Sequence, residues 1–188
     1  MLVLTEPSIP LSIIKDLDVE DLARLPRGYR YELREGNLFI TTPSTYWHKR
    51  MARRLLLMLF AAGLDVLQDT GVRGDRPRDN RVPDLGVIGD DSAETAGISN
   101  LPGSAFRLVV EIVSENSPNG EYTDKASWYA HRGIPEYWIV DQDPEGSQGD
   151  AVVLMHRLAG EAEDPVYDHV RTVRLSELEA EYREKRAG

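Results

Sequence analysis

Two short apolar runs, each carrying one carboxylate, limit what this chain of 188 residues can fold into. Asp84 opens the run Asp84–Ile88, and Glu111 interrupts the run Leu108–Val113. Runs of this length and composition are typical of strands buried in a sheet. A carboxylate within such a strand costs free energy unless it is paired or binds a cation. The sequence therefore predicts a sheet that carries an ionic site.

Other patterns complete a single α/β domain, in which a mixed sheet is flanked by helices. Apolar periodicity and capping residues predict helices at Asp18–Leu25, from the N-cap Ser44 to Ala62, at Thr123–His131 and at Ser176–Arg186. In the last of these helices, Ser176 and Glu179 have capping-box spacing. Strands are predicted in a hairpin at Tyr31–Thr41, at Leu64–Val72, Asp84–Ile88, Arg107–Val113 and Glu136–Asp141, and in a closing hairpin of Ala151–Leu158 and Tyr167–Leu175. We expect a lead-in over residues 1–17 and one domain over residues 18–188.

The composition excludes several classes of protein. The chain has no cysteine, so disulfides and thiolate metal sites are ruled out. Its first residues lack the basic and apolar segments of a signal peptide. The longest apolar run, Leu55–Leu64, is about half as long as a membrane span. We therefore expect a cytoplasmic protein with no membrane partner.

Charge is unevenly distributed along the chain, whose formal net charge is -10. Residues 1–82 contain 13 Lys/Arg and 11 Asp/Glu, whereas residues 83–188 contain 9 and 21. The overall charge argues against a general nucleic-acid coat, because phosphate neutralisation needs clustered basic residues. Two basic clusters are present: Lys49, Arg50, Arg53 and Arg54, and Arg73, Arg76, Arg78 and Arg81. Either they hold a polyanion at one face or they are a solvated helix face and a charged loop.

The candidate site residues fit metal-dependent cleavage of a phosphodiester. This reaction needs an activated water and neutralised phosphoryl oxygens, and Mg²⁺ held by hard oxygen ligands serves both needs. Asp84 and Glu111 supply two carboxylates from neighbouring predicted strands, and the backbone carbonyl of Ile112 is a candidate third ligand. Lys125, at the start of a predicted helix, would orient or deprotonate the water and stabilise charge in the transition state.

The order of these residues resembles the PD-(D/E)XK nuclease superfamily and, within it, the Uma-type restriction endonuclease family. The resemblance runs from about Tyr31 to Asp141 and rests on an ordered set of motifs: Tyr31-Glu32-Leu33 with Gly36, His48, Val82-Pro83-Asp84-Leu85, Leu108-Val109-Val110-Glu111-Ile112-Val113-Ser114, and Lys125 with Tyr129-Ala130, Gly133 and Glu136–Asp141. It implies a restriction-endonuclease-like fold, dependence on Mg²⁺ or Mn²⁺, nucleic acid, above all DNA, as the partner, and a homodimer.

One departure from the superfamily concerns the lysine, which usually stands two residues after the acid on the same strand face. Here Val113 occupies that position. The Uma-type family carries its lysine on the following helix, so the resemblance assigns this role to Lys125. Where the family often has an aspartate shortly before the lysine, this chain has Glu121 and Asp124. The charge is kept, but the reach of the side chain changes.

Several of these residues have a simpler interpretation when taken alone. Asp84 could begin a strand after a turn, and a helix lysine such as Lys125 is usually solvated. Glu32 could add a third carboxylate or be a surface residue of its hairpin. For His48 a place on the helix surface is favoured over contact with phosphate or support of the site. Glu111 is the exception, because its neighbours are apolar on both sides.

The sequence thus predicts a divalent-metal-dependent nuclease in which Asp84 and Glu111 bind the metal, Lys125 positions the water and Glu32 assists. The alternative is a catalytically inactive, dimeric binding module with the same fold, which the acidic charge favours. For the aromatic residues Tyr129, Tyr137 and Trp138, packing of a helix against a strand is favoured over stacking on nucleobases.

Overall fold

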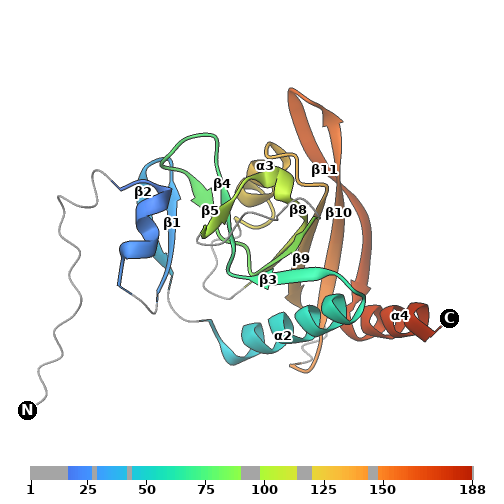
Figure 1. Ribbon diagram of the computed structural model, residues 1–188. Coiled ribbons are helices and arrows are strands. Elements are labelled where there is room, and N and C mark those ends of the chain that lie inside the picture. The colour runs from blue at the N-terminus through green and yellow to red at the C-terminus, as the bar shows by residue number, and fades with distance from the viewer. Residues whose placement is uncertain are drawn as a thin grey trace, which may run out of the picture.

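A six-stranded mixed sheet forms the centre of the molecule, with the strand order β11-β10-β9-β8-β6-β3 (Figure 1). The computed structural model describes residues 17–26, 29–41, 44–89, 98–113, 120–143 and 148–187. Neighbouring strands of the sheet are antiparallel except β8 and β9, which are parallel. The strands are β3 (Asp65–Gln68), β6 (Leu85–Ile88), β8 (Phe106–Ile112), β9 (Glu136–Gln142), β10 (Ala151–Glu161) and β11 (Asp164–Arg174).

Helices cover both faces of this sheet, which confirms the predicted α/β class. One face carries α2 (Tyr46–Ala61) and α4 (Leu175–Ala187), whose apolar residues share a core with the sheet. The other face carries α3 (Asp124–Ala130), which lies between β8 and β9 in the chain and makes the crossover that two parallel strands require.

Alternation along β8 divides its side chains between the two cores. Leu108, Val110 and Ile112 pack in the core of α2 and α4, whereas Val109 packs in the core of α3. Side chains two residues apart in a strand lie on the same face. Glu111 therefore shares the face of Val109, and its carboxylate is directed toward α3.

The buried stripe of α2 includes one polar residue, His48. The helix begins after Thr45, whose hydroxyl accepts a hydrogen bond at 3.3 Å from the backbone N–H of His48, so the predicted cap at Ser44 is wrong by one residue. Gly63, with a φ of 82°, follows the end of the helix as expected for a glycine stop. The buried residues recur at helical spacing: His48, Met51, Ala52, Leu55, Met58 and Leu59.

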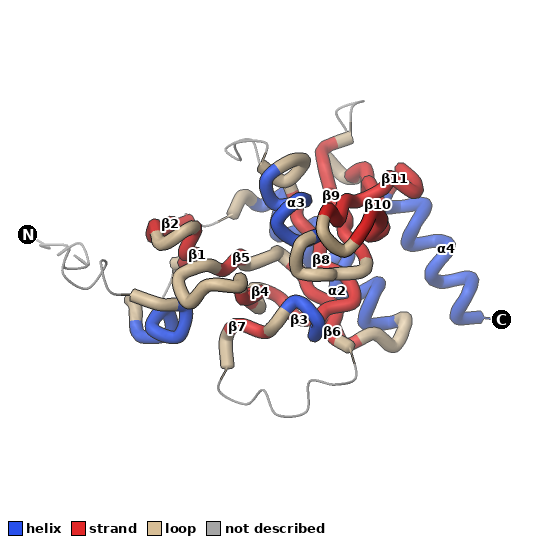
Figure 2. The backbone as a smooth tube through the Cα atoms, turned by 90° about the horizontal axis from the view of Figure 1, so that it is seen from above, coloured by secondary structure: helices blue, strands red, loops and turns tan. Residues whose placement is uncertain are grey.

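Two small sheets flank the central one. The hairpin of β1 (Arg30–Arg34) and β2 (Asn37–Thr41) agrees with prediction, and a three-stranded sheet has the order β5-β4-β7. Figure 2 shows both on the side of the molecule opposite α4. The predicted strand Leu64–Val72 is wrong, because Asp69, with a φ of 52°, separates β3 from β4. The three strands are β4 (Gly71–Arg73), β5 (Asn80–Arg81) and β7 (Asn100–Leu101).

The remaining elements follow the predicted order. Short 3₁₀ turns are η1 (Val19–Arg24), within the first predicted helix, and η2 (Gly103–Ala105). β10 and β11 form the predicted closing hairpin, a few residues longer than expected. Ser176 is the second residue of α4, and its N–H and hydroxyl donate to Asp150 at 3.1 and 2.6 Å. It is therefore not the cap that its spacing from Glu179 predicted.

The predicted lead-in, residues 1–17, lies outside the described residues except for Leu17, and the domain boundary stays a prediction. None of the helices in the described part of the chain combines the length and the hydropathy that a membrane crossing requires.

Gly86 in β6 is required by the close approach of a neighbouring strand. A Cβ atom on Gly86 would lie 2.6 Å from Cε1 of Phe106, which is 1% exposed and has no room to move. We expect Gly86→Ala to lower the free energy of unfolding by about 1–3 kcal/mol through overpacking, measured by urea denaturation. Gly89→Ala is the matched control, because its Cβ would meet its nearest neighbour at an ordinary 3.7 Å. Equal stability of the two variants would contradict this account.

Candidate functional site

The structure brings the four predicted site residues into one buried region between the sheet, α3 and the β1–β2 hairpin. Asp84 directly precedes β6, Glu111 lies in β8, Lys125 in the first turn of α3 and Glu32 in β1. Asp84, Glu111 and Glu32 are 4%, 2% and 2% exposed, and the Lys125 side chain is 14% exposed. Buried charges of this kind persist only where partners compensate their lost hydration.

Glu111 receives two hydrogen bonds from α3. Nζ of Lys125 donates to Oε2 at 2.8 Å, and the hydroxyl of Tyr129 donates to Oε1 at 2.7 Å. Lys125 and Tyr129 stand four residues apart, so they reach the strand from the same face of the helix. Lys125 also donates to Oε1 of Glu121 at 3.4 Å. The carboxylate inside the apolar run thus meets the helix lysine that was predicted to accompany it.

Asp84 is held from three directions. Its Oδ1 accepts a hydrogen bond from Arg30 at 2.9 Å, and its Oδ2 accepts one from Nε2 of His48 at 3.1 Å. The backbone N–H of Ile112 donates to Oδ2 at 2.8 Å, which fixes Asp84 beside the residue that follows Glu111. The two predicted metal-binding carboxylates therefore come from adjacent strands and lie at the same end of the sheet.

The two carboxylates differ in electrostatic environment. Burial raises the pKa of Asp84, but the hydrogen bond from His48 and the charge of Arg30 outweigh it and bring the pKa to about 2. Burial also raises the pKa of Glu111, and the nearby charge of Asp84 raises it further against the opposing effect of Lys125, to about 7. Asp84 is thus ionised at neutral pH, whereas the pKa of Glu111 is shifted upward from its usual range.

Lys125 stays protonated. Burial lowers the pKa of its ammonium, but the charges of Glu111 and Glu32 and the hydrogen bond to Glu111 raise it above the ordinary value. A lysine with a raised pKa does not accept a proton from water at neutral pH. Of the two roles considered for Lys125, orientation with charge stabilisation fits the structure, and deprotonation of the water does not.

Glu32 lies near the site, but both of its oxygens have partners within the fold. Oε1 accepts the backbone N–H of Val82 at 2.9 Å, and Oε2 accepts two hydrogen bonds from Arg34 at 2.8 and 2.6 Å. It is not the exposed hairpin residue of the simpler interpretation. Its charge contributes to the raised pKa of Lys125, which gives it an electrostatic role in the cluster.

The preference for His48 on the helix surface is wrong. His48 is 8% exposed and contacts Asp84, as described above. The signal was present in the sequence, because His48 precedes Met51 and Leu55 by three and seven residues and so begins the buried stripe of α2. Tyr129 packs as predicted, but its hydroxyl also binds Glu111, and its spacing from Lys125 was the missed signal.

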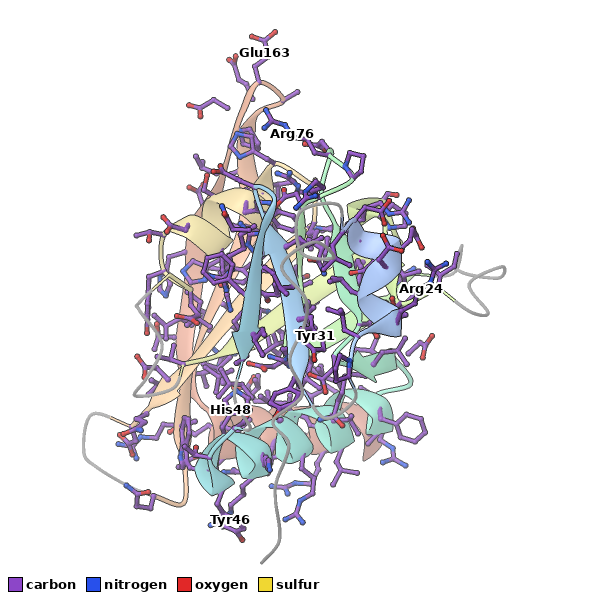
Figure 3. All side chains as sticks on the ribbon, turned by 90° about the vertical axis from the view of Figure 1, so that its left-hand side faces the viewer. Arg24, Tyr31, Tyr46, His48, Arg76 and Glu163 are labelled. Atoms are coloured by element: carbon purple, nitrogen blue, oxygen red, sulfur yellow. The ribbon has the colours of Figure 1, made fainter. Side chains whose placement is uncertain are left out.

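Arg30 was not predicted at all. It stands at the start of β1, 54 residues before its partner Asp84, and it also pairs with Asp69 in the bend between β3 and β4. No local sequence pattern links these positions. Figure 3 shows the β1–β2 hairpin crossing in front of the sheet, above His48 on α2. This packing of the hairpin is what brings Arg30 to the carboxylates.

The donor set fits a small hard cation. Within the described residues no three His, Cys, Asp or Glu side chains are arranged to hold a metal ion. Mg²⁺ needs fewer, since it keeps several waters and is commonly held by one or two carboxylates. Asp84 and Glu111 are carboxylates of this kind, and burial together with repulsion by Asp84 raises the pKa of Glu111, an effect that a bound cation would offset. Arg30 contacts Asp84 and Lys125 contacts Glu111, so these side chains balance the charges that a metal ion would otherwise balance.

The two basic clusters are partly used inside the fold. Arg54 donates to Glu179 of α4 through Nε and NH2, both at 2.9 Å, and so joins α2 to α4. Arg81 donates to Asp79 at 3.0 Å. The residues of the first cluster that remain exposed on α2 are Lys49, Arg50 and Arg53.

Comparisons with known proteins agree with this architecture. The family model Uma2, described as "Putative restriction endonuclease", matches residues 19–183 of the chain. Among solved structures the chain is similar to a protein from Anabaena variabilis ATCC 29413 described as "a putative nuclease belonging to DUF820". The TM-score is 0.58, the identity is 16%, and the match covers 84% of this chain and 83% of that chain. No curated protein matches.

The chain shares its fold, a mixed sheet with flanking helices, with that solved structure. Because the family model covers most of its length, the chain belongs to the Uma2 family of restriction-endonuclease-like proteins. The predicted family is thereby confirmed.

Proposed function

We propose that this protein is a divalent-metal-dependent endonuclease that hydrolyses phosphodiester bonds in DNA. The observation that carries the proposal is the meeting of three elements at one point. Asp84 before β6 binds the backbone beside Glu111 of β8, and Lys125 of α3 binds the Glu111 carboxylate itself. A cytoplasmic location and a homodimer stay predictions that accompany this proposal.

Asp84, Glu111 and the backbone carbonyl of Ile112 would hold Mg²⁺ or Mn²⁺, which when bound lowers the pKa of a water and neutralises phosphoryl oxygens. His48 and the Ile112 N–H orient Asp84, and Tyr129 orients Glu111. These contacts fix the carboxylates before a substrate arrives, which is the value of a preorganised site.

Two cationic side chains would act on the substrate. The Lys125 ammonium would donate to the attacking water or to a phosphoryl oxygen, and Glu32 helps to keep it charged. The Arg30 side chain would release Asp84 and bind a phosphate of the substrate instead. Guanidinium groups bind phosphate oxygens in the same forked geometry in which they bind carboxylate oxygens. Charge stabilisation of this kind commonly contributes about two to three orders of magnitude in rate.

One observation favours the alternative of a catalytically inactive binding module. All four carboxylate oxygens of Asp84 and Glu111 already have partners within the protein. A buried cluster satisfied in this way can be a structural ion-pair network with no chemistry. The alternative predicts the same fold and the same hydrogen bonds but no turnover.

The nuclease and the binding module are distinguished by cleavage assays on supercoiled plasmid and on single-stranded DNA, each with Mg²⁺, Mn²⁺ or EDTA. We expect metal-dependent cleavage that Glu111→Gln abolishes. Glu163→Gln is the matched control, because Glu163 lies at the tip of the β10–β11 turn, far from the site (Figure 3). Absence of cleavage over the whole panel by the folded wild type would favour the binding module, and cleavage that survives Glu111→Gln would refute the site.

A further inference from the structure

A pocket of about 420 Å³ lies directly beside the candidate site. Two of its lining residues connect it to the carboxylates. Arg30 lines the pocket and donates to Asp84, and Val82 lines the pocket and donates its N–H to Glu32. A molecule in this pocket would therefore touch the same guanidinium that contacts the catalytic aspartate.

Rings and aliphatic side chains form one part of the pocket lining. Tyr29 and Tyr31 have ring centroids 6.3 Å apart at an angle of 52°, and Leu22 of η1 and Val82 add apolar surface. Tyr29 is 46% exposed, so its ring is open to a ligand, whereas the Tyr31 hydroxyl is fixed by donation to the Pro26 carbonyl at 2.8 Å. A planar aromatic ligand would stack on such a surface.

Amide groups form a second part of the lining. Asn80 and Asn100 are 0% and 5% exposed, and Nδ2 of Asn80 donates to Oδ1 of Asn100 at 2.8 Å. Oδ1 of Asn80 accepts the Leu33 N–H at 2.7 Å, and Nδ2 of Asn100 donates to the Ser99 hydroxyl at 3.1 Å. These bonds fix the orientation of both amides.

The two amides belong to the buried part of the pocket lining. Each amide nitrogen has a second N–H, and each amide oxygen has a second lone pair. Amide groups beside an aromatic surface are the chemistry that recognises the edge and the face of a nucleobase. Gly71 leaves the space that the Asn100 amide occupies, since a Cβ on it would lie 1.9 Å from Oδ1 of Asn100.

We propose that this pocket binds one unpaired nucleobase of the strand whose phosphate contacts Arg30. The inference rests on the proposed function for the identity of the polymer. A base that is stacked within a duplex cannot enter a pocket without leaving the helix, which costs free energy. The protein therefore selects single-stranded or locally opened nucleic acid over fully paired duplex.

Binding without cleavage tests the pocket. Oligonucleotides that carry 2-aminopurine are titrated with the full-length protein in EDTA, as a single strand and as a blunt duplex, and the fluorescence of the base analogue is followed. We expect quenching and tighter binding for the single strand. Tyr29→Ala should weaken single-strand binding about tenfold and reduce the quenching, because stacking on one aromatic ring is lost.

Two further variants control the experiment. Tyr29→Phe keeps the ring and should retain the wild-type affinity. Tyr46→Ala removes a tyrosine that is 79% exposed on α2 and is absent from the pocket lining, and it should change nothing (Figure 3).

The outcomes separate this inference from the proposed function. Equal affinity for strand and duplex, or wild-type binding by Tyr29→Ala, overturns the pocket even if metal-dependent cleavage is found. Quenching that depends on Tyr29, in a protein that cleaves nothing, supports the pocket and rejects the nuclease activity.

Discussion

Lys125→Met is expected to lower the rate of DNA cleavage by about a hundredfold to a thousandfold while Mn²⁺ binding persists. The reason is that the ammonium, 2.8 Å from Glu111, is the cation positioned to stabilise charge that develops on the phosphate. Cleavage is followed under single-turnover conditions, and Mn²⁺ binding by calorimetry. The matched control is Lys185→Met, which removes an exposed lysine from α4.

The conservative variant Lys125→Arg distinguishes a role in chemistry from one in folding. It keeps the charge and should recover part of the lost rate, although the larger guanidinium will not reproduce the geometry. All variants are first compared by thermal denaturation, since loss of one member of a buried ion pair is itself destabilising. A folded Lys125→Met protein with undiminished cleavage would remove Lys125 from the mechanism.

The raised pKa of Lys125 adds a pH criterion with a definite sign. Because the ammonium persists above its ordinary range, ionisation of Lys125 should leave no inflection in the rate between about pH 6 and pH 10. A general base would give the opposite result, a rate that rises with pH until the lysine loses its proton. If the cleavage rate rises with the pKa of a lysine in the wild type and does not in Lys125→Arg, Lys125 acts as the proton acceptor after all.

The central part of this site was predictable because it depends on short-range patterns. The apolar run around Glu111 predicts a buried strand, and its period of two directs the carboxylate to the face opposite Val110. The helix after that strand must return over the same face to begin a parallel strand. Lys125 is on that helix, but the resemblance to the Uma-type family, and not the spacing alone, assigned it a place beside Glu111.

The surroundings of the site were less predictable, for different physical reasons. His48 was visible as part of a helical stripe, but a histidine in such a stripe does not by itself identify a partner. The division of Leu64–Val72 depends on a left-handed backbone at Asp69, which side-chain patterns do not reveal. Arg30 depends on the docking of a hairpin against a distant bend, a contact that local propensity does not encode.

Arg30→Met is expected to tighten Mn²⁺ binding about tenfold and yet slow DNA cleavage about a hundredfold. The guanidinium lies 2.9 Å from Oδ1 of Asp84 and competes with any cation for that oxygen, so its removal favours the metal. Asp84 keeps its charge in this variant at neutral pH, because the hydrogen bonds from His48 and from the Ile112 N–H still lower its pKa. The slower cleavage follows from the loss of a phosphate-binding group. Arg24→Met, at an arginine whose side chain is 84% exposed, is the matched control.

If Arg30 is a counter-ion that can be displaced from Asp84, its loss raises the affinity for metal and lowers the cleavage rate. A purely structural Arg30 would hold Asp84 in position, and its loss would weaken metal binding and cleavage together, with a lower melting temperature. Methionine preserves most of the apolar volume of the arginine stem, which limits the packing cost. If Mn²⁺ affinity falls in a variant that melts like wild type, Asp84 needs Arg30 to bind metal, and the proposed transfer of the guanidinium to phosphate is wrong.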